Sequence, residues 1–428
     1  MSIIIDRDSL EHIAEGKTKQ IYAVRGQPEY VVIRSKDALT ANNAQRRNEL
    51  EGKARIANET TCKTFGFLQN IGVRTHFVER LSETEFIGER CEMIPIEWVA
   101  RRLATGSYLK RCPGVQEGYR FAPLKLETFF KDDAAGDPQW SDEQMEECLH
   151  FSKAQIALMK RMTTVVFEAL ERAWSTVDCQ LVDMKIEFGL TTKGEIVVAD
   201  VIDNDSWRVW PKCDKRLQLD KQAYRDLDVV TSDKLKEVLT KYEQVASLLS
   251  SFLSSPTRCR VVIFAGSASD LPHCHRIATK AEQLGLHTET HVSSAHKATE
   301  ETLALAATAL SSSVPTVIIA VAGRSNGLGP VIAGSSPLPV INSPPSSEAW
   351  GDKDIWSSLR MPSGMGCVTV IDPEEAAIAA AKMLASHNHL VFGSILGDQL
   401  RNYTKIFEAE TALRHGSGKL NGTSGLKA

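Results

Sequence analysis

Polar and apolar residues alternate along residues 182–188, near the middle of the chain. The charged residues of this stretch all fall on one face and the apolar residues on the other, the charged ones being Asp183, Lys185 and Glu187. Such alternation is typical of a strand that is buried on one side. A second arm follows and ends at Asp200. We predict a hairpin whose two central turn residues are Lys193 and Gly194.

The turn decides which residues of the two arms face each other. With Lys193 and Gly194 at its centre, Glu187 lies directly opposite Asp200, with β-carbons roughly 5 Å apart. Two carboxylates at this distance repel unless a cation lies between them, and Mg²⁺ takes carboxylate oxygens, waters and substrate phosphates as ligands. We therefore predict that Glu187 and Asp200 bind Mg²⁺. The alternative is a solvated strand face whose acids are neutralised by Lys185, since a longer loop would shift the register.

The second half of the chain has a different pattern of apolar and polar residues. We predict strands at residues 260–265, 287–292 and 317–321, of which the first is a continuous apolar run, and a short polar loop follows each of them, in a pattern of alternating strands and helices. This order predicts parallel strands in a doubly wound sheet with helices on both faces. The polar loops then leave the carboxyl ends of the strands, which is where such folds bind ligands.

A helix end marks the boundary between the two halves. A charged amphipathic pattern runs from Ser232 to Leu253 and meets the sequence SSPT. Proline ends a helix, and small polar residues are typical of a linker. A chain of 428 residues is long enough for two or three domains. We predict domains at residues 1–253 and 259–411, a linker at 254–258 and a glycine-rich, disordered tail at 412–428.

Composition excludes several classes of protein. The net charge is −4, and residues 258–428 contain 14 basic and 14 acidic residues, so neither half is a basic nucleic-acid-binding module. No apolar run reaches about 18 residues, and the start of the chain does not resemble a signal peptide. The nine cysteines form no CxxC pair, which argues against a disulfide framework and a zinc cluster. We expect a cytoplasmic protein with small-molecule partners and no membrane or nucleic-acid partner.

Two loops of the first half carry residues suited to phosphate. Gly16 lets the backbone approach a ligand, and Lys17 and Lys19 point the same way on the strand that follows. An exposed hairpin turn would show the same residues. Arg101 precedes a small-residue turn that ends at Ser107, and a forked guanidinium beside backbone N–H and hydroxyl donors can hold a phosphate monoester.

These residues belong to longer stretches that resemble a known family. Residues 94–107, IPIEWVARRLATGS, and residues 181–189, LVDMKIEFG, are similar to the two signature stretches of phosphoribosylaminoimidazole-succinocarboxamide synthetase. EGKTK, at residues 15–19, resembles the nucleotide loop of that family. The similarity extends over roughly residues 8–250. It implies an ATP-binding α+β fold and a Mg²⁺ cofactor in the first half.

The resemblance also implies roles for individual residues. ATP would be bound by Gly16, Lys17, Lys19, Glu92 and Met93. Lys17 and Lys185 would take part in catalysis. The substrate would be bound by Arg101, Ser107, Asp205 and Arg208. For the aspartate pocket, the polarity of one loop suggests Asp37 and Asn42.

Three polar loops follow the predicted strands of the second half. Ser267 and Ser269 lie at a helix N-terminus, where free N–H groups and the helix dipole suit a phosphate, although such serines also serve merely as caps. His296 and Lys297 follow the second strand. His296 is the best candidate for a base, because an imidazole accepts protons near neutral pH; the alternative is a helix N-terminal residue with no chemical role.

Residues 259–400 resemble phosphoribosylaminoimidazole carboxylase. GSASD at 266–270 matches its phosphate and ribose loop, and AGRSNGLGP at 322–330 is similar to the form that uses CO₂ directly. The resemblance implies a flavodoxin-like domain without a cofactor and a homo-oligomer, an octamer, assembled through this domain. It implies catalysis by His296 and Lys297 and a CO₂ site at Ser325. The implied substrate-binding residues are Gly266, Ser267, Ser269, Asp270, Ser294, Arg324 and Gly327.

The expected architecture is thus an α+β ATP-binding synthetase domain followed by an α/β flavodoxin-like parallel-sheet domain, as in the fused purine-biosynthesis enzymes of animals. Such an enzyme is both a lyase and a ligase. It would carboxylate aminoimidazole ribonucleotide with CO₂, without ATP or biotin, and then use ATP and Mg²⁺ to join the new carboxylate to L-aspartate. Two alternatives stay open. The second half could be a mutase that acts on an N-carboxylated substrate, or the chain could be a non-catalytic nucleotide sensor.

Overall fold

The computed structural model describes residues 5, 7–41, 46–225, 227, 229–254, 256–346 and 353–417. The chain divides into two compact units, one of residues 1–254 with 397–428 and one of residues 255–396. Helix α12 (His389–Ser417) continues through the predicted domain end at 411, and residues 412–417 are helical where the sequence analysis expects disorder. Residues 418–428 of that predicted tail lie outside the described residues. None of the described helices is long and apolar enough to span a membrane.

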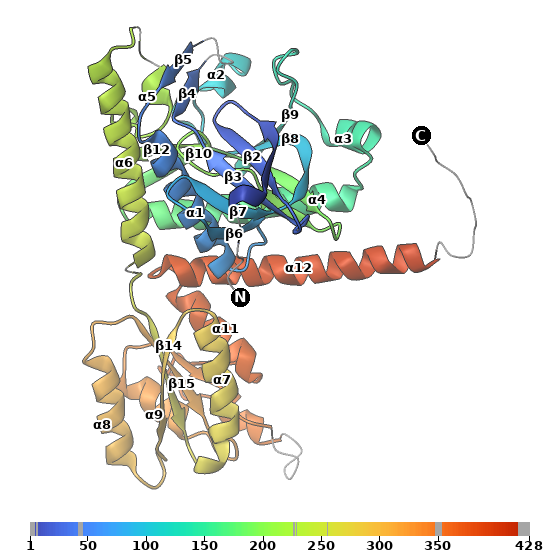
Figure 1. Ribbon diagram of the computed structural model, residues 1–428. Helices are drawn as coiled ribbons and strands as arrows, with labels where there is room; N and C mark the ends of the chain where they lie inside the picture. The colour runs from blue at the N-terminus through green and yellow to red at the C-terminus, as the bar shows by residue number, and fades with distance from the viewer. Residues whose placement is uncertain are drawn as a thin grey trace. The chain divides into compact units, whose positions relative to one another are not determined.

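The first unit contains two five-stranded antiparallel sheets (Figure 1). The first sheet has the order β1-β2-β3-β7-β6, formed by Leu10–Glu15, Lys19–Val24, Tyr30–Ser35, Glu85–Glu89 and Phe77–Arg80. Helix α1 (Lys53–Asn70) packs against it through a small apolar core that includes Ile33, Cys62 and Phe86. The turn between β1 and β2 carries Gly16 and Lys17.

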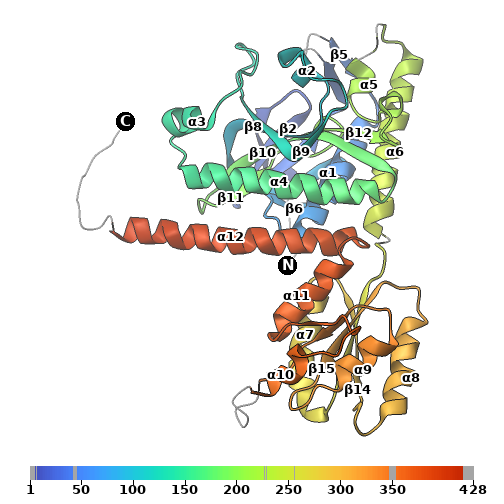
Figure 2. The same cartoon turned by 180° about the vertical axis from the view of Figure 1, so that it is seen from behind.

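The second sheet is centred on β10 (Cys179–Thr191). It has the order β11-β10-β8-β9, with β12 also paired to β10. The other strands are β11 (Ile196–Ala199), β8 (Cys91–Leu103), β9 (Arg120–Phe130) and β12 (Trp207–Pro211). Helix α4 (Lys153–Ser175) begins at Ser152, which forms a capping box with Gln155, and covers one face of the sheet (Figure 2). The opposite face of the sheet is left for charged side chains.

The β10–β11 hairpin differs from its predicted register by one residue. Glu187 pairs with Ala199, not with Asp200. The loop has three residues, because the Thr191 hydroxyl accepts the N–H groups of positions 193 and 195 and Gly194 has a φ of 78°, as expected of a three-residue hairpin with glycine in the left-handed region. The predicted two-residue turn is therefore wrong. Asp200 follows the end of β11 with a φ of 64°.

Smaller elements complete the first unit. They are the pair β4 (Ala38–Ala41) and β5 (Arg46–Glu49) and the helices α2 (Ser107–Arg111), α3 (Asp142–Leu149), α5 (Gln222–Arg225) and α6 (Ser232–Ser254). Helix α6 packs with α1 around a core that includes Tyr224 and Tyr242.

The second unit confirms the predicted doubly wound parallel sheet. Its order is β14-β13-β15-β16-β17, formed by His287–Val292, Arg260–Ala265, Thr316–Val321, Val340–Asn342 and Val368–Thr369, and every pair is parallel. Alternate residues of β13 face opposite sides. Val261 and Ile263 pack with α7 (Leu271–Gln283) and α11 (Pro373–Leu384), and Val262 and Phe264 pack with α8 (Thr299–Leu310) and α9 (Leu328–Ser335). A short helix, α10 (Trp356–Leu359), precedes β17.

Candidate active sites

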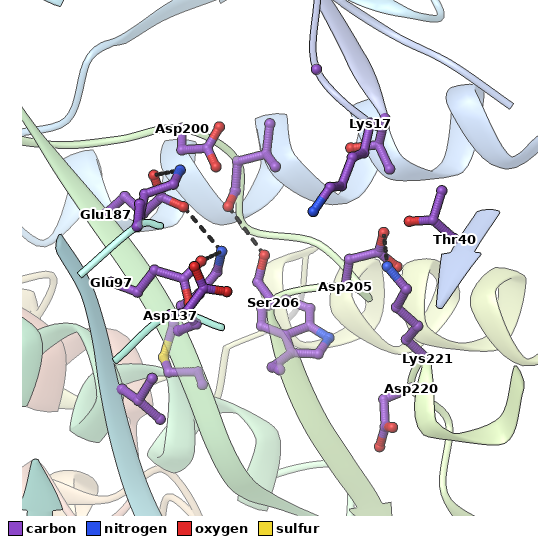
Figure 3. Close-up of a pocket in the computed structure, with 18 of the residues that line it drawn as sticks. Lys17, Thr40, Glu97, Asp137, Glu187, Asp200, Asp205, Ser206, Asp220 and Lys221 are labelled. Carbon is purple, nitrogen blue, oxygen red and sulfur yellow. Dashed lines mark hydrogen bonds and ion pairs between the residues drawn. The ribbon is translucent and has the colours of Figure 1, made fainter. Parts of the chain in front are cut away.

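A charged cavity of about 900 Å³ opens on the uncovered face of the β10 sheet. The β1–β2 turn, β8, β10 and β12 contribute to its wall, as does the loop that follows β9. Figure 3 shows Glu187 and Asp200 at one end and Asp205 with Lys221 at the other. Many of the predicted synthetase residues line it, namely Gly16, Lys17, Lys19, Arg101, Lys185, Glu187, Asp200, Asp205 and Arg208.

The predicted acid pair lies in this cavity and is compensated by lysines. Glu187 is only 2% exposed and accepts hydrogen bonds from Lys185 (3.0 Å) and Lys131 (2.7 Å). Asp200 forms an ion pair with Lys19. Burial alone would raise the pKa of Glu187, but the charges of Lys185, Lys131 and Lys19 outweigh it and lower the pKa to about 2. The alternative of a solvated strand face is wrong in its exposure, because Glu187 is buried, but Lys185 does neutralise this acid as that alternative predicted.

The donor set of the acid pair fits Mg²⁺. Two carboxylates share one cavity, and both are held there by ammonium groups that neutralise them. Mg²⁺ is commonly bound by one or two carboxylates and completes its ligands with water and substrate phosphates. Among the described residues, no group of three or more His, Cys, Asp and Glu forms an all-protein metal site, so any ion here would need oxygen ligands from elsewhere.

A second, more apolar cavity of about 340 Å³ adjoins the charged one. Apolar side chains line much of it, namely Ile13, Ile21, Val31, Ile33 and Met93. It shares four residues with the charged cavity, which are Lys19, Lys131, Glu187 and Asp200. Cys91 and Met93 line it, whereas Glu92 lies between them in the alternation of β8 and is exposed. An apolar slot that leads into a lysine-rich junction suits an aromatic base carrying phosphates.

The predicted phosphate-binding residues converge on one buried carboxylate. Asp183 accepts hydrogen bonds from Arg101 (2.5 Å) and Arg208 (2.6 Å), and Arg101 also approaches the hydroxyl of Ser107 at 3.5 Å. Gly106 has a φ of 60°, and a Cβ there would lie 2.7 Å from the Arg208 guanidinium. The glycine therefore allows the Arg208 side chain to lie against the turn. This places two guanidinium groups and a hydroxyl side by side.

Asp205 lies at the far end of the charged cavity within a buried cluster. Lys221 donates to it over 3.0 Å, Tyr242 donates over 3.2 Å, and Lys53 lies 3.5 Å away. Burial would raise the pKa of Asp205, but the charges of Lys53 and Lys221 hold it well below its usual range. Asp205 is thus a fixed carboxylate that faces the cavity.

The proposed aspartate-pocket residues behave differently from this cluster. One carboxylate oxygen of Asp37 accepts the N–H of Ala54 at the start of α1, over 2.8 Å, and Asp37 is not among the residues that line the charged cavity. Asn42 lies outside the described residues. Lys131 and Lys53 contact residues of the site but were not predicted. No local pattern around Lys131 or Lys53 marks them, because each reaches the site from a distant segment.

In the second unit, the three predicted loops meet at one edge of the sheet. Ala265 pairs with both Val292 and Val321, so the loops after β13, β14 and β15 leave the sheet side by side. His296 lies directly against Gly327, where a Cβ would be 2.5 Å from Nε2. The exposed side chains at this edge include those of Ser267, Ser269, His296, Lys297, Arg324 and Ser325.

Internal hydrogen bonds shape these loops. The Ser267 hydroxyl accepts the N–H of Ser269 over 3.3 Å, and burial raises the pKa of the neighbouring Asp270. The carbonyl of Ser294 accepts the N–H of Lys297 over 3.1 Å. Asn326, which was not predicted, is buried, and its amide donates to the Ser358 hydroxyl over 3.0 Å. These bonds hold the first two loops from within and join the third loop to the segment that carries Ser358.

Comparison with known proteins gives the same division of the chain. A SAICAR synthetase family model matches residues 12–242, and an AIR carboxylase family model matches residues 260–405. The chain is 58% identical to the Probable multifunctional protein ADE2 of Caenorhabditis elegans, over 95% of this chain and 97% of that protein. It is 50% identical to the human bifunctional phosphoribosylaminoimidazole carboxylase/phosphoribosylaminoimidazole succinocarboxamide synthetase, over 94% of this chain and 96% of that protein.

A solved structure supports the first half of this division. The fold of phosphoribosylaminoimidazole-succinocarboxamide synthase from Ehrlichia chaffeensis covers 56% of this chain and 98% of its own, with a TM-score of 0.52 and 29% identity. A SAICAR synthetase solved in complex with ADP has the same TM-score and coverage at 27% identity. The chain therefore belongs to the family of bifunctional purine-biosynthesis enzymes that combine AIR carboxylase, a lyase, with SAICAR synthetase, an ATP-dependent ligase.

Proposed function

We propose that the charged cavity of the first unit is the site of amide synthesis, with Mg²⁺ held by Glu187 and Asp200. The observation that carries this proposal is the junction of the two cavities, where Lys19, Lys131 and the acid pair are shared. A nucleotide base in the apolar cavity would direct its phosphates to this junction. Glu92 and Met93 would lie beside the base, and Gly16, Lys17 and Lys19 beside the phosphates.

The substrate would enter from the other end of the charged cavity. Arg101, Arg208 and Ser107 offer charge-assisted donors for its phosphate, and Asp205 would accept a hydrogen bond from its ring substituents. Its carboxylate would then point toward the acid pair, where Lys17, Lys19 and Lys185 stabilise the charge of the transferred phosphoryl group. Bound there, Mg²⁺ would supply further neutralisation of the phosphates.

Phosphorylation makes the carboxylate a good electrophile. The amine of L-aspartate would attack its carbon, the bond to the phosphoryl oxygen would break, and phosphate would leave with the bonding electrons. Asp37 and Asn42 remain our proposal for part of the aspartate pocket. For Asp37 this requires a partner other than the N–H of Ala54 when aspartate binds.

In the second unit we propose direct carboxylation by CO₂ at the loop edge. Gly266, Ser267, Ser269 and Asp270 would hold the ribonucleotide, with help from Ser294 and Arg324. The ring carbon is enamine-like and attacks CO₂ held by Ser325 and the N–H of Gly327. In the structure this N–H donates to the carbonyl of Ser325 over 2.9 Å, so it would change partner when CO₂ binds. His296 would accept the proton of that carbon, and Lys297 would stabilise the new carboxylate. The close approach of His296 to Gly327 supports this pairing of base and CO₂ site.

One assay tests both proposals. Purified protein receives aminoimidazole ribonucleotide and bicarbonate, first alone and then with ATP, Mg²⁺ and aspartate, with and without EDTA. We expect carboxylation in the first stage, unaffected by EDTA, and amide formation only in the second stage, abolished by EDTA. Loss of carboxylation with EDTA, or ATP consumption that tracks it, would contradict the cofactor-free route. Turnover only with N-carboxylated substrate would identify a mutase, and binding without product would identify a sensor.

We also propose that the enzyme is a cytoplasmic homo-oligomer, an octamer, assembled through the second unit. Large apolar side chains exposed on this unit support an interface, among them Leu271, Trp356 and Leu359. We expect residues 258–428 alone to retain the assembly and residues 1–257 alone to be monomeric. Light scattering measures both masses, and a monomeric 258–428 fragment would contradict the proposal.

A further inference from the structure

We propose that His76 is a positioning residue for Asp200, and that it holds the backbone of Asp200 in the conformation that directs its carboxylate into the charged cavity. This inference rests on the proposed role of Asp200 as a Mg²⁺ ligand. It assigns a function to a buried histidine that lines the apolar cavity but not the charged one.

A short stretch of pairing places His76 beside the end of β11. Thr75 forms a parallel bridge with Val198. The N–H of His76 donates to the carbonyl of Val198 over 2.9 Å, and the N–H of Val198 donates to the carbonyl of Arg74 over 3.1 Å. Since β11 ends at Ala199, the imidazole lies at the position where the chain turns out of the strand.

The imidazole has one polar partner there and is otherwise enclosed. Its Nε2 lies 2.9 Å from the carbonyl oxygen of Asp200, and a carbonyl only accepts, so Nε2 carries the hydrogen. The ring is 5% exposed and packs edge-on against Phe65 and Phe86. A Cβ at Gly88 would lie 3.1 Å from its Nδ1, so the ring has little room to move.

Asp200 needs such a support. Its φ of 64° is uncommon for a residue other than glycine and persists where the surroundings hold it. Ala199 pairs with Glu187 and so shares its face of the sheet. If the strand continued in extended form, residue 200 would point to the opposite face. The left-handed turn at Asp200 therefore brings its carboxylate into the cavity that Glu187 faces (Figure 3).

The test compares metal binding in four variants of the full chain. The probe is Mn²⁺, measured without and with ADP because His76 also lines the cavity proposed for the nucleotide base, and free Mn²⁺ is measured by electron paramagnetic resonance. The variants are His76→Ala, His76→Gln, Gly88→Ala and Phe65→Leu. Glutamine retains an N–H donor. Gly88→Ala adds a methyl group 3.1 Å from Nδ1 of the ring and 3.0 Å from Cδ1 of Ile33, without removing the ring. Phe65→Leu removes packing next to the ring but leaves the hydrogen bond. Thermal unfolding and carboxylase activity report the integrity of the fold.

We expect His76→Ala to weaken Mn²⁺ binding at least about tenfold, Gly88→Ala to weaken it by less, and His76→Gln to stay within about threefold of wild type. Phe65→Leu should lower the melting temperature without this loss of affinity. If His76→Ala does not fold, the Mn²⁺ affinities of Gly88→Ala and His76→Gln still test whether His76 positions Asp200. Unchanged affinity in both His76→Ala and Gly88→Ala, or an equal loss in Phe65→Leu, would overturn the inference. Retained Mn²⁺ binding in Asp200→Asn would instead overturn the acid-pair proposal itself.

Discussion

Lys131 donates a hydrogen bond to Glu187 over 2.7 Å, so a lysine just beyond the end of β9 compensates a carboxylate buried in the middle of β10. The two residues are far apart in sequence, and the contact forms at the junction of the two cavities. A cation that binds Glu187 must displace this ammonium group or share the carboxylate with it. The contact therefore predicts competition between Lys131 and a metal ion.

Lys131→Met should make the first unit more responsive to Mg²⁺. Without Lys131 the buried Glu187 loses one of its compensating charges, and an ion no longer has to displace a lysine. We expect Mg²⁺ alone to raise the melting temperature of Lys131→Met more than that of the wild type. The control is Lys193→Met, in the exposed hairpin loop. Equal shifts in all three proteins would contradict competition at Glu187.

Asp200→Asn should separate the two activities. The substitution removes one proposed metal ligand but leaves the second unit unaltered, so amide synthesis should be abolished and carboxylation should be preserved. Both rates are measured on the same preparation. A parallel loss of both activities in a folded protein would argue against separate sites.

Asp183→Asn should weaken binding of the ribonucleotide more than that of ATP. The single carboxylate oxygen that accepts from Arg101 and Arg208 would lose its charge, and both guanidinium groups would be held less firmly. We expect KM for the carboxylated ribonucleotide to rise at least about tenfold, with a smaller change in KM for ATP. Glu171→Gln is the matched control. Glu171 accepts a hydrogen bond from Arg102 over 2.7 Å, and neither residue lines the charged cavity. A comparable rise in that control would contradict the role of Asp183.

Gly327→Ala should abolish carboxylation by displacing His296. The added Cβ would lie 2.5 Å from Nε2 of the imidazole, whereas a Cβ at Gly323, in the same loop, would have its nearest neighbour at 3.4 Å. Gly323→Ala is therefore the control and should keep most of the activity. Steady-state carboxylation rates decide between them. Equal activities would mean that His296 does not act from the position it has in the structure.

Asp220→Asn should change how stability depends on pH. Burial raises the pKa of Asp220 to about 6, so the folded state binds its proton more tightly than the unfolded state does. The ionised form therefore destabilises the fold above pH 6 by about 3 kcal/mol, and this penalty disappears as the pH falls toward 4. The melting temperature of Asp220→Asn relative to wild type should be higher at pH 7.5 than at pH 5. A difference that is independent of pH would show that Asp220 titrates normally.

The local sequence pattern predicted a good part of both sites. The alternation in β10 placed Asp183, Lys185 and Glu187 on one face, and all three line the charged cavity. It did not determine the register of the hairpin, because the Thr191 hydroxyl and the left-handed Gly194 favour a loop one residue longer than predicted. Asp200 reaches the cavity through its own left-handed backbone, which no spacing rule indicates.

The sequence by itself determined the parallel sheet of the second unit and the meeting of its three loops. Continuous apolar strands fit only a sheet covered on both faces, and parallel strands end at the same edge. Only the tertiary structure decided that Lys131, Lys53 and His76 support the first site. No local pattern marks any of the three as a site residue. Their distances from Glu187, Asp205 and Asp200 are set by how α1, the end of β9 and the segment bridged to β11 through Thr75 pack. Long-range packing, which local periodicity does not encode, therefore completes the site.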